Sequence, residues 1–170
     1  MKISKSEFAA RRKRLMSEMA PNSVAIIPAA REVTRSRDTE YPFRQNSDFF
    51  YLTGFQEPDG VLFILPGRRQ GQVLMFCRDR DPERELWDGY RQGPDGVVKN
   101  FGMNDAYPVG DMDDIVPGLI EGRSTVYYSM GHDDSFDRQV FGWINQIRAM
   151  VRTGAKPPGD ISDLAVLLHE

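Results

Sequence analysis

Residues 40–55 combine two kinds of side chain that rarely share a segment, and this stretch strongly constrains the fold. It holds six of the sixteen Phe and Tyr residues in the chain. A surface loop does not need so many aromatic rings, and a core strand does not need so many polar groups. The mixture predicts a loop, held by polar contacts, that runs into a buried strand at residues 49–53. The polar side chains in the stretch are Glu40, Arg44, Gln45, Asn46 and Asp48.

Short apolar runs elsewhere predict further buried strands. They lie at residues 24–28, 61–65, 72–77 and 125–128. Turn signals rich in Pro and Gly separate the strand at 61–65 from the segments before and after it. The strands at 49–53, 61–65 and 72–77 are therefore expected to form an antiparallel meander.

Helical patterns fill most of the remaining chain. Ser4 and Glu7 fit a capping box at the start of an amphipathic helix, and residues 11–14 are expected on its solvent-exposed face. Asp160 is expected to cap an apolar helical segment at the end of the chain. Other helices are expected at residues 82–86, 94–101, 111–120 and 134–152.

The alternation of strands and helices predicts an α/β protein. We expect a three-layer α/β/α arrangement around a mixed, mostly antiparallel sheet of about six strands. A chain of 170 residues is long enough for one such domain. Residues 1–156 are expected to form that domain, and residues 157–170 a linker that leads into a hinge.

Composition and charge exclude several classes of function. The net charge is −3 and no basic run occurs, which argues against a nucleic-acid partner. No apolar run approaches a membrane span, and the N-terminus lacks the apolar segment of a signal peptide, so we expect a cytoplasmic protein. Cys77, the single cysteine, lies in an apolar run and is expected to be a buried, inert thiol.

Residues that could support catalysis are scarce. The only histidines are His132 and His169, and neither belongs to a metal-binding motif. The acidic groups at residues 111–114 and 133–134 are expected to cap helices rather than to bind a metal. No motif for a serine or cysteine nucleophile and no glycine-rich phosphate loop is present. The residues alone therefore predict a chain without a self-contained catalytic site.

Trp87 lies in a charged segment and allows two interpretations. The segment either folds back and buries the indole, or it projects the indole toward a partner or a ligand, as interface Trp residues do.

Three stretches together resemble a known family. Residues 34–55, the pair Glu57 and Pro58, and residues 85–89 closely resemble the N-terminal, creatinase-like domain of bacterial Xaa-Pro aminopeptidase, or aminopeptidase P. In that family a second domain of the pita-bread fold binds two divalent metals, usually manganese, and releases the residue that precedes proline. The resemblance implies that the metal ligands lie in that second domain, so this chain alone is expected to be inactive.

The resemblance also implies tasks for the N-terminal domain. It packs on its own catalytic domain, builds dimer or tetramer contacts and closes part of the mouth that receives proline-containing peptides. Trp87 matches a Trp that reaches a neighbouring subunit's active site, and Asp38 matches an acidic residue at the same rim. The motif residues expected to hold the loop are Tyr41, Arg44, Asn46 and Asp48.

Two alternatives stay open on the sequence. The chain could be a stand-alone module that binds a peptide or a small ligand through its polar and aromatic loop. It could also be the same domain of a prolidase or creatinase relative, which shares the architecture but acts on another substrate.

Overall fold

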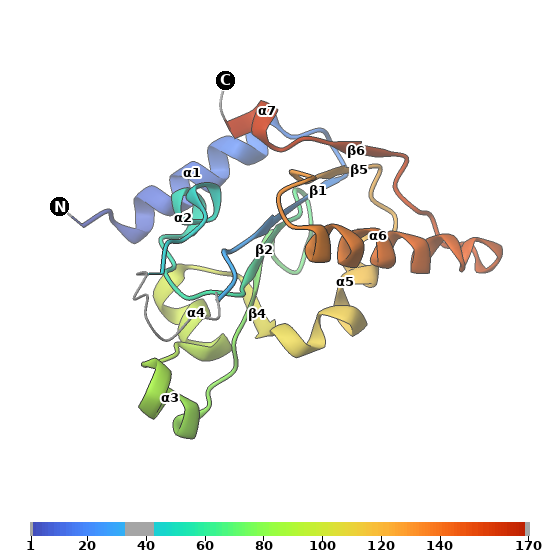
Figure 1. The fold of residues 1–170 in the computed structure, drawn as a ribbon. Helices are drawn as coiled ribbons and strands as arrows, with labels where there is room; N and C mark the ends of the chain where they lie inside the picture. The colour runs from blue at the N-terminus through green and yellow to red at the C-terminus, as the bar shows by residue number, and fades with distance from the viewer. Residues whose placement is uncertain (1, 33–42, 169–170) are drawn as a thin grey trace.

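The computed structural model describes residues 2–32 and 43–168. These residues form a six-stranded sheet with the strand order β4-β3-β2-β1-β5-β6. Helices cover both of its faces (Figure 1). The strands are β1 (Ser23–Pro28), β2 (Val61–Ile64), β3 (Val73–Cys77), β4 (Asp105–Pro108), β5 (Thr125–Tyr127) and β6 (Asp160–Ser162).

The strand directions confirm a mixed sheet, and they correct the expectation that most of its strand pairs are antiparallel. β1 pairs with β2, and β2 with β3, in antiparallel fashion. The pairs β1–β5, β3–β4 and β5–β6 are parallel, so parallel pairs outnumber antiparallel pairs among the described strands. The reason is the connections: a short turn joins β2 to β3, whereas helical crossovers precede β4, β5 and β6 and return the chain in the same direction.

The helices divide between the two faces. α1 (Lys5–Glu18), α2 (Ser47–Thr53) and α4 (Gly93–Phe101) contribute to one hydrophobic cluster, and α5 (Met112–Ile120) and α6 (Asp134–Arg148) contribute to the other. α3 (Pro82–Asp88) is described throughout and adds no residue to either cluster. In Figure 1 it lies at the lower left, away from the sheet. The remaining helical segments are η1 (Val109–Asp111), η2 (Val151–Thr153) and α7 (Ala165–Leu168).

The central strands are buried on both faces, which explains their continuous apolar runs. Along β1, Ala25 and Ile27 belong to the cluster under α1, α2 and α4. Val24 and Ile26 belong to the opposite cluster under α5 and α6. All four side chains are almost fully buried, so the three-layer prediction is confirmed by the way the strands divide their side chains.

Residues 47–53 form helix α2, and the prediction of a strand at 49–53 is wrong. The Asn46 side chain accepts a hydrogen bond of 3.0 Å from the Phe49 amide and so caps the helix start. Gly54 ends the helix in the left-handed region, at φ 70°, and its amide donates to the Phe50 carbonyl. These two caps favour a helix more than the aromatic content favours a strand.

The two edge strands were not predicted. β4 and β6 are short and contain Asp, Tyr, Pro and Ser, so neither gives an apolar run. Residues 160–162 pair with β5, so the segment expected to be a linker contains a strand of the sheet. Asp160 is part of that strand and does not begin a helix.

Candidate functional site

Gln45 ties the polar loop before α2 to its surroundings. Its Oε1 accepts hydrogen bonds from the amides of Ala30, at 2.8 Å, and Asn46, at 3.0 Å. Its Nε2 donates to the carbonyl oxygens of Phe55, at 3.1 Å, and Glu57, at 2.8 Å. One amide side chain thus uses both its acceptor and its donors on the backbone, and it joins the end of β1 to the chain on both sides of α2.

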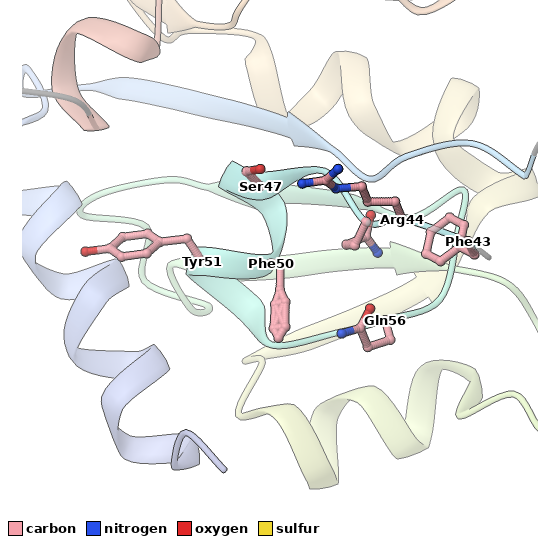
Figure 2. A pocket seen from close by; sticks show the side chains of 7 residues that line it. Phe43, Arg44, Ser47, Phe50, Tyr51 and Gln56 are labelled. Atoms are coloured by element: carbon pink, nitrogen blue, oxygen red, sulfur yellow. The ribbon is translucent and has the colours of Figure 1, made fainter. Parts of the chain in front are cut away.

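An open pocket of about 470 Å³ lies beside this loop. Figure 2 shows its lining side chains around α2 and the segments on either side of it. Arg44 supplies a positive charge, and none of these seven described residues is a His, Asp, Glu or Cys. Such a lining can bind and orient a ligand, and the Tyr51 hydroxyl is its one group of the kinds used in acid–base catalysis. The lining consists of Phe43, Arg44, Gln45, Ser47, Phe50, Tyr51 and Gln56.

Two arginines of α1 contact α2, which corrects the expectation that residues 11–14 face solvent. Arg12 is only 3% exposed and donates a hydrogen bond of 2.8 Å to the Leu52 carbonyl. Arg11 donates to the Tyr51 carbonyl at 3.1 Å, and its guanidinium lies 4.4 Å from the centre of the Tyr51 ring. The two carbonyls belong to the last turn of α2, where helical partners are missing.

Residues 79–93, which we call the arm, carry the three most exposed large apolar side chains of the described residues. Leu86 is 85% exposed, Trp87 is 88% exposed and Tyr90 is 65% exposed. Of the two interpretations of Trp87, burial is therefore wrong, and the indole projects from α3 into solvent. Arg80 lies over the Tyr90 ring, 4.7 Å from its centre.

Glu85 is the one α3 residue that faces the interior of the arm. Its side chain is only 8% exposed. Its carboxylate accepts hydrogen bonds of 2.9 Å from the amides of Asp81 and Arg91. The bond from the Arg91 amide is the main cause that holds the pKa of Glu85 below its ordinary value. Sequence analysis missed this role, because Glu85 stands among charged residues that look like a solvated surface.

A charged cluster lies at the base of the arm. Arg78 approaches Glu57 at 3.6 Å, and both side chains are mostly buried. The other carboxylate oxygen of Glu57 accepts a hydrogen bond of 2.8 Å from the Gln92 amide. Arg91 is 9% exposed and donates to the Asp79 carbonyl at 3.3 Å. The cluster thus joins the base of the arm to the turn that follows α2.

The residues predicted for the site are not brought together among the described segments. Asp38 and Tyr41 lie outside the described residues. Arg44 lines the pocket and is exposed, and Asn46 caps α2. Asp48 lies in the first turn of α2, where the helix dipole favours a negative charge, and Trp87 lies on the separate arm.

Two of the acidic residues at helix starts, Asp113 and Asp133, have structural contacts. Asp133 accepts a hydrogen bond of 3.0 Å from the Phe136 amide and caps α6. Asp113 accepts one of 2.8 Å from the Trp143 indole, which joins α5 to α6. Asp111 stands at the N-cap of α5 without a side-chain hydrogen bond to that helix. Among residues 2–32 and 43–168, no three His, Cys, Asp or Glu side chains are placed to hold a metal ion.

In the part of the chain that the structure describes, no helix is both long and apolar enough to cross a bilayer. Cys77 is fully buried in β3. Burial raises the pKa of its thiol to about 12, and the charges of Glu57 and Asp79 act in the same direction.

Xaa-Pro aminopeptidases align with most of this chain. The chain is 37% identical to the Xaa-Pro aminopeptidase of Escherichia coli K12 over 169 residues, which cover 99% of this chain and 38% of that protein. It is 33% identical to human Xaa-Pro aminopeptidase 3 over 138 residues, which cover 74% of this chain and 27% of that protein. The chain therefore spans less than two fifths of the length of either relative.

Solved structures share the fold closely. The aminopeptidase PepP of Pseudomonas aeruginosa superposes with a TM-score of 0.95 at 56% identity, covering 99% of this chain and 38% of that chain. Zinc-substituted aminopeptidase P of E. coli in complex with product gives a TM-score of 0.93 at 36% identity, covering 100% of this chain and 39% of that chain. A family model for the aminopeptidase P N-terminal domain matches residues 8–127. The chain is therefore a member of the family of aminopeptidase P N-terminal domains.

Proposed function

We propose that this chain works as the N-terminal domain of a Xaa-Pro aminopeptidase. Its relatives are named Xaa-Pro aminopeptidases, and this chain aligns with less than two fifths of the length of each of the two described above. In this proposal a pita-bread catalytic domain supplies the reaction, and the present domain contributes contacts between subunits and part of the mouth of the active site. A cytoplasmic location and a dimeric or tetrameric assembly belong to the same proposal.

The exposed indole of Trp87 is the observation that carries the proposal. A side chain of this size that is 88% exposed on a helix outside both hydrophobic clusters contributes little to the fold. Trp is enriched among the residues that dominate binding energy at interfaces, and large exposed apolar groups mark binding surfaces. We assign Trp87 to the rim of a substrate pocket, with Asp38 as a second rim residue.

The metals implied by the family do not fit the residues described. Within residues 2–32 and 43–168, no cluster of ligating side chains exists for a divalent ion. We therefore attribute two divalent metals, with manganese as the expected ion, to the catalytic domain. No step of the hydrolysis is assigned to the side chains of this chain, whose proposed part is to bind, to orient and to exclude water.

The first test is an assay of the 170-residue chain itself. With added manganese and a peptide that has proline in the second position, we expect no release of the first residue. Turnover that a chelator abolishes would show that the chain holds its own catalytic site. It would contradict the assignment of catalysis to a second domain.

The second test is Trp87→Ala in the intact aminopeptidase. Truncation of an aromatic side chain that dominates a contact lowers affinity by about tenfold or more, so we expect a similar fall in kcat/KM on proline peptides. Val98→Ala is the matched control, because Val98 is also apolar and partly exposed but lies on α4 outside the arm. An unchanged kcat/KM for Trp87→Ala would refute the role at the rim.

The pocket beside α2 supports a second candidate, a peptide-binding module. Its aromatic and amide lining with one arginine suits a peptide that carries a carboxylate. Titration calorimetry of the isolated chain with a proline peptide distinguishes the two functions. Binding that Arg44→Ala removes would favour the module, whereas no binding favours the domain of a larger enzyme.

A further inference from the structure

The arm has a defined shape without an apolar core. Its large apolar side chains, Leu86, Trp87 and Tyr90, are all mostly exposed. Order in a surface segment normally comes from buried apolar contacts, and segments that lack them tend to open locally. Polar contacts must therefore supply the order of the arm.

One carboxylate makes most of these contacts. Glu85 accepts from the amide of Asp81, just before α3, and from the amide of Arg91, beyond the end of α3, each at 2.9 Å. The Nε atom of Arg80 lies 3.0 Å and 3.2 Å from its two oxygens. Hydrogen bonds to a charged acceptor are about twice as strong as neutral ones. Glu85 therefore closes the arm into a loop.

The base of the arm is tied separately. Glu57 accepts a hydrogen bond from the amide of Gln92, and the Arg91 guanidinium donates to the carbonyl of Asp79. These contacts fix where the two ends of the arm leave the domain, but they lie outside α3. The bonds of Glu85 join the segments on both sides of α3 to the helix that carries Trp87, whereas the Asp81 side chain reaches only the Arg84 amide in the first turn.

We propose that Glu85 is a positioning residue that closes the arm and thereby sets the position of Trp87. Its effect on the reaction rests on the proposed function of Trp87 at the pocket rim. An indole that is already held in place loses little freedom when substrate arrives, so a loose arm weakens substrate binding. The effect is therefore expected in KM, with kcat nearly unchanged.

The first experiment measures the arm itself in the 170-residue chain. In Glu85→Ala, we expect the amides of Asp81 and Arg91 to exchange hydrogen about tenfold faster, because each loses its charged acceptor. The fluorine NMR signal of 5-fluorotryptophan at Trp87 should shift and broaden, while that of buried Trp143 should not change. Glu83→Ala is the matched control, since Glu83 is an exposed glutamate on the same helix.

Either result of this experiment tests whether Glu85 positions the arm. Faster exchange with a changed Trp87 signal would support that role. Unchanged exchange at both amides together with an unchanged Trp87 signal would overturn it. If Glu85→Ala does not fold, Glu85→Gln gives the same measurement: an amide keeps one acceptor oxygen, so at least one of the two amides should still lose protection.

The second experiment is a double-mutant cycle in the intact aminopeptidase. We expect Glu85→Ala to raise KM severalfold, with kcat within about twofold of the wild type. When Trp87 is already replaced by Ala, removing Glu85 should add no more than about twofold, because Glu85 acts through Trp87. Additive losses would overturn the positioning role. An unchanged kcat/KM in Trp87→Ala alone would instead refute the proposed rim function, while the exchange experiment still decides how Glu85 acts on the arm.

Discussion

The guanidinium of Arg12 donates a buried hydrogen bond of 2.8 Å to the carbonyl oxygen of Leu52. Arg12 is 3% exposed and Leu52 is fully buried. The carbonyl belongs to the last turn of α2, where intrahelical donors are missing and a nearby positive charge is favourable. α1 thus completes the hydrogen bonding of the short helix that carries the polar motif.

Arg12→Ala should lower the free energy of unfolding by about 2–3 kcal/mol. The change leaves the Leu52 carbonyl buried without its charged donor, and it removes the buried stem of the arginine. Denaturant unfolding followed by circular dichroism measures the effect. Lys13→Ala, at the next and exposed position of α1, should change the stability by less than about 0.5 kcal/mol. Equal effects of the two substitutions would contradict the structural role of Arg12.

Gly54→Ala should destabilise the domain more than an ordinary glycine substitution. Gly54 adopts φ +70°, and a Cβ there would lie 2.4 Å from Cε2 of the Phe8 ring. Gly122 has a similar φ of +82° with nothing within 4 Å of its Cβ position, so Gly122→Ala measures the backbone cost alone, about 1 kcal/mol. Gly54→Ala adds the cost of overpacking and should reach about 2–4 kcal/mol.

A second substitution tests the cause of that cost. Phe8→Leu shortens the side chain that the new methyl group would meet, so the pair Gly54→Ala and Phe8→Leu should cost less than the sum of the two single changes. Thermal unfolding of the four proteins measures this difference. Strict additivity would mean that the methyl group does not collide with Phe8.

The sequence predicts the central strands and the long helices because their signals are local. β1, β2 and β3 are buried on both faces and read as apolar runs, and α6 has a clear apolar face with Asp133 as its cap. The edge strands β4 and β6 lack such runs, since their side chains are only partly buried. Their pairing is set by where the preceding helices return the chain, which no local pattern shows.

In the candidate site too, some features follow from local sequence and others depend on contacts with distant parts of the chain. The charged surroundings of Trp87 leave its exposure as an alternative, and the structure decides it. The burial of Arg12 and the closure by Glu85 depend on backbone groups distant in the sequence or across a loop, so residue type does not predict them. Residues 47–53 show that paired caps at Asn46 and Gly54 can turn an aromatic segment into a helix.

Cys77 should resist thiol reagents while the domain is folded. Burial raises its pKa to about 12, so almost no thiolate exists at pH 8, and the thiolate is the reactive form. Labelling with a chromogenic disulfide reagent should be slow in buffer and fast in concentrated guanidinium chloride. The destabilised Arg12→Ala protein should label faster than the wild type, because reaction requires opening. Rapid labelling of the native wild type would contradict the burial of Cys77.

Acid should open the arm only at a pH below the ordinary titration range of glutamate. The amide of Arg91 lowers the pKa of Glu85 in the folded protein. Because this pKa lies below its unfolded value, the stabilisation is complete above about pH 4.3, the ordinary value, and is lost as the pH falls through the lowered one. The fluorine signal of Trp87, followed from neutral to acid pH, should therefore change with a midpoint below that value.

Substitution of Glu85 identifies the group responsible for this transition. Glu85→Gln removes the titrating carboxylate and should abolish the acid transition of the Trp87 signal. Asp81 is a second carboxylate of the arm, and it accepts a hydrogen bond of 3.2 Å from the Arg84 amide. Asp81→Asn keeps that acceptor and should leave the transition in place. A transition that survives in Glu85→Gln but disappears in Asp81→Asn would assign the acid sensitivity to the helix cap and not to the closure by Glu85.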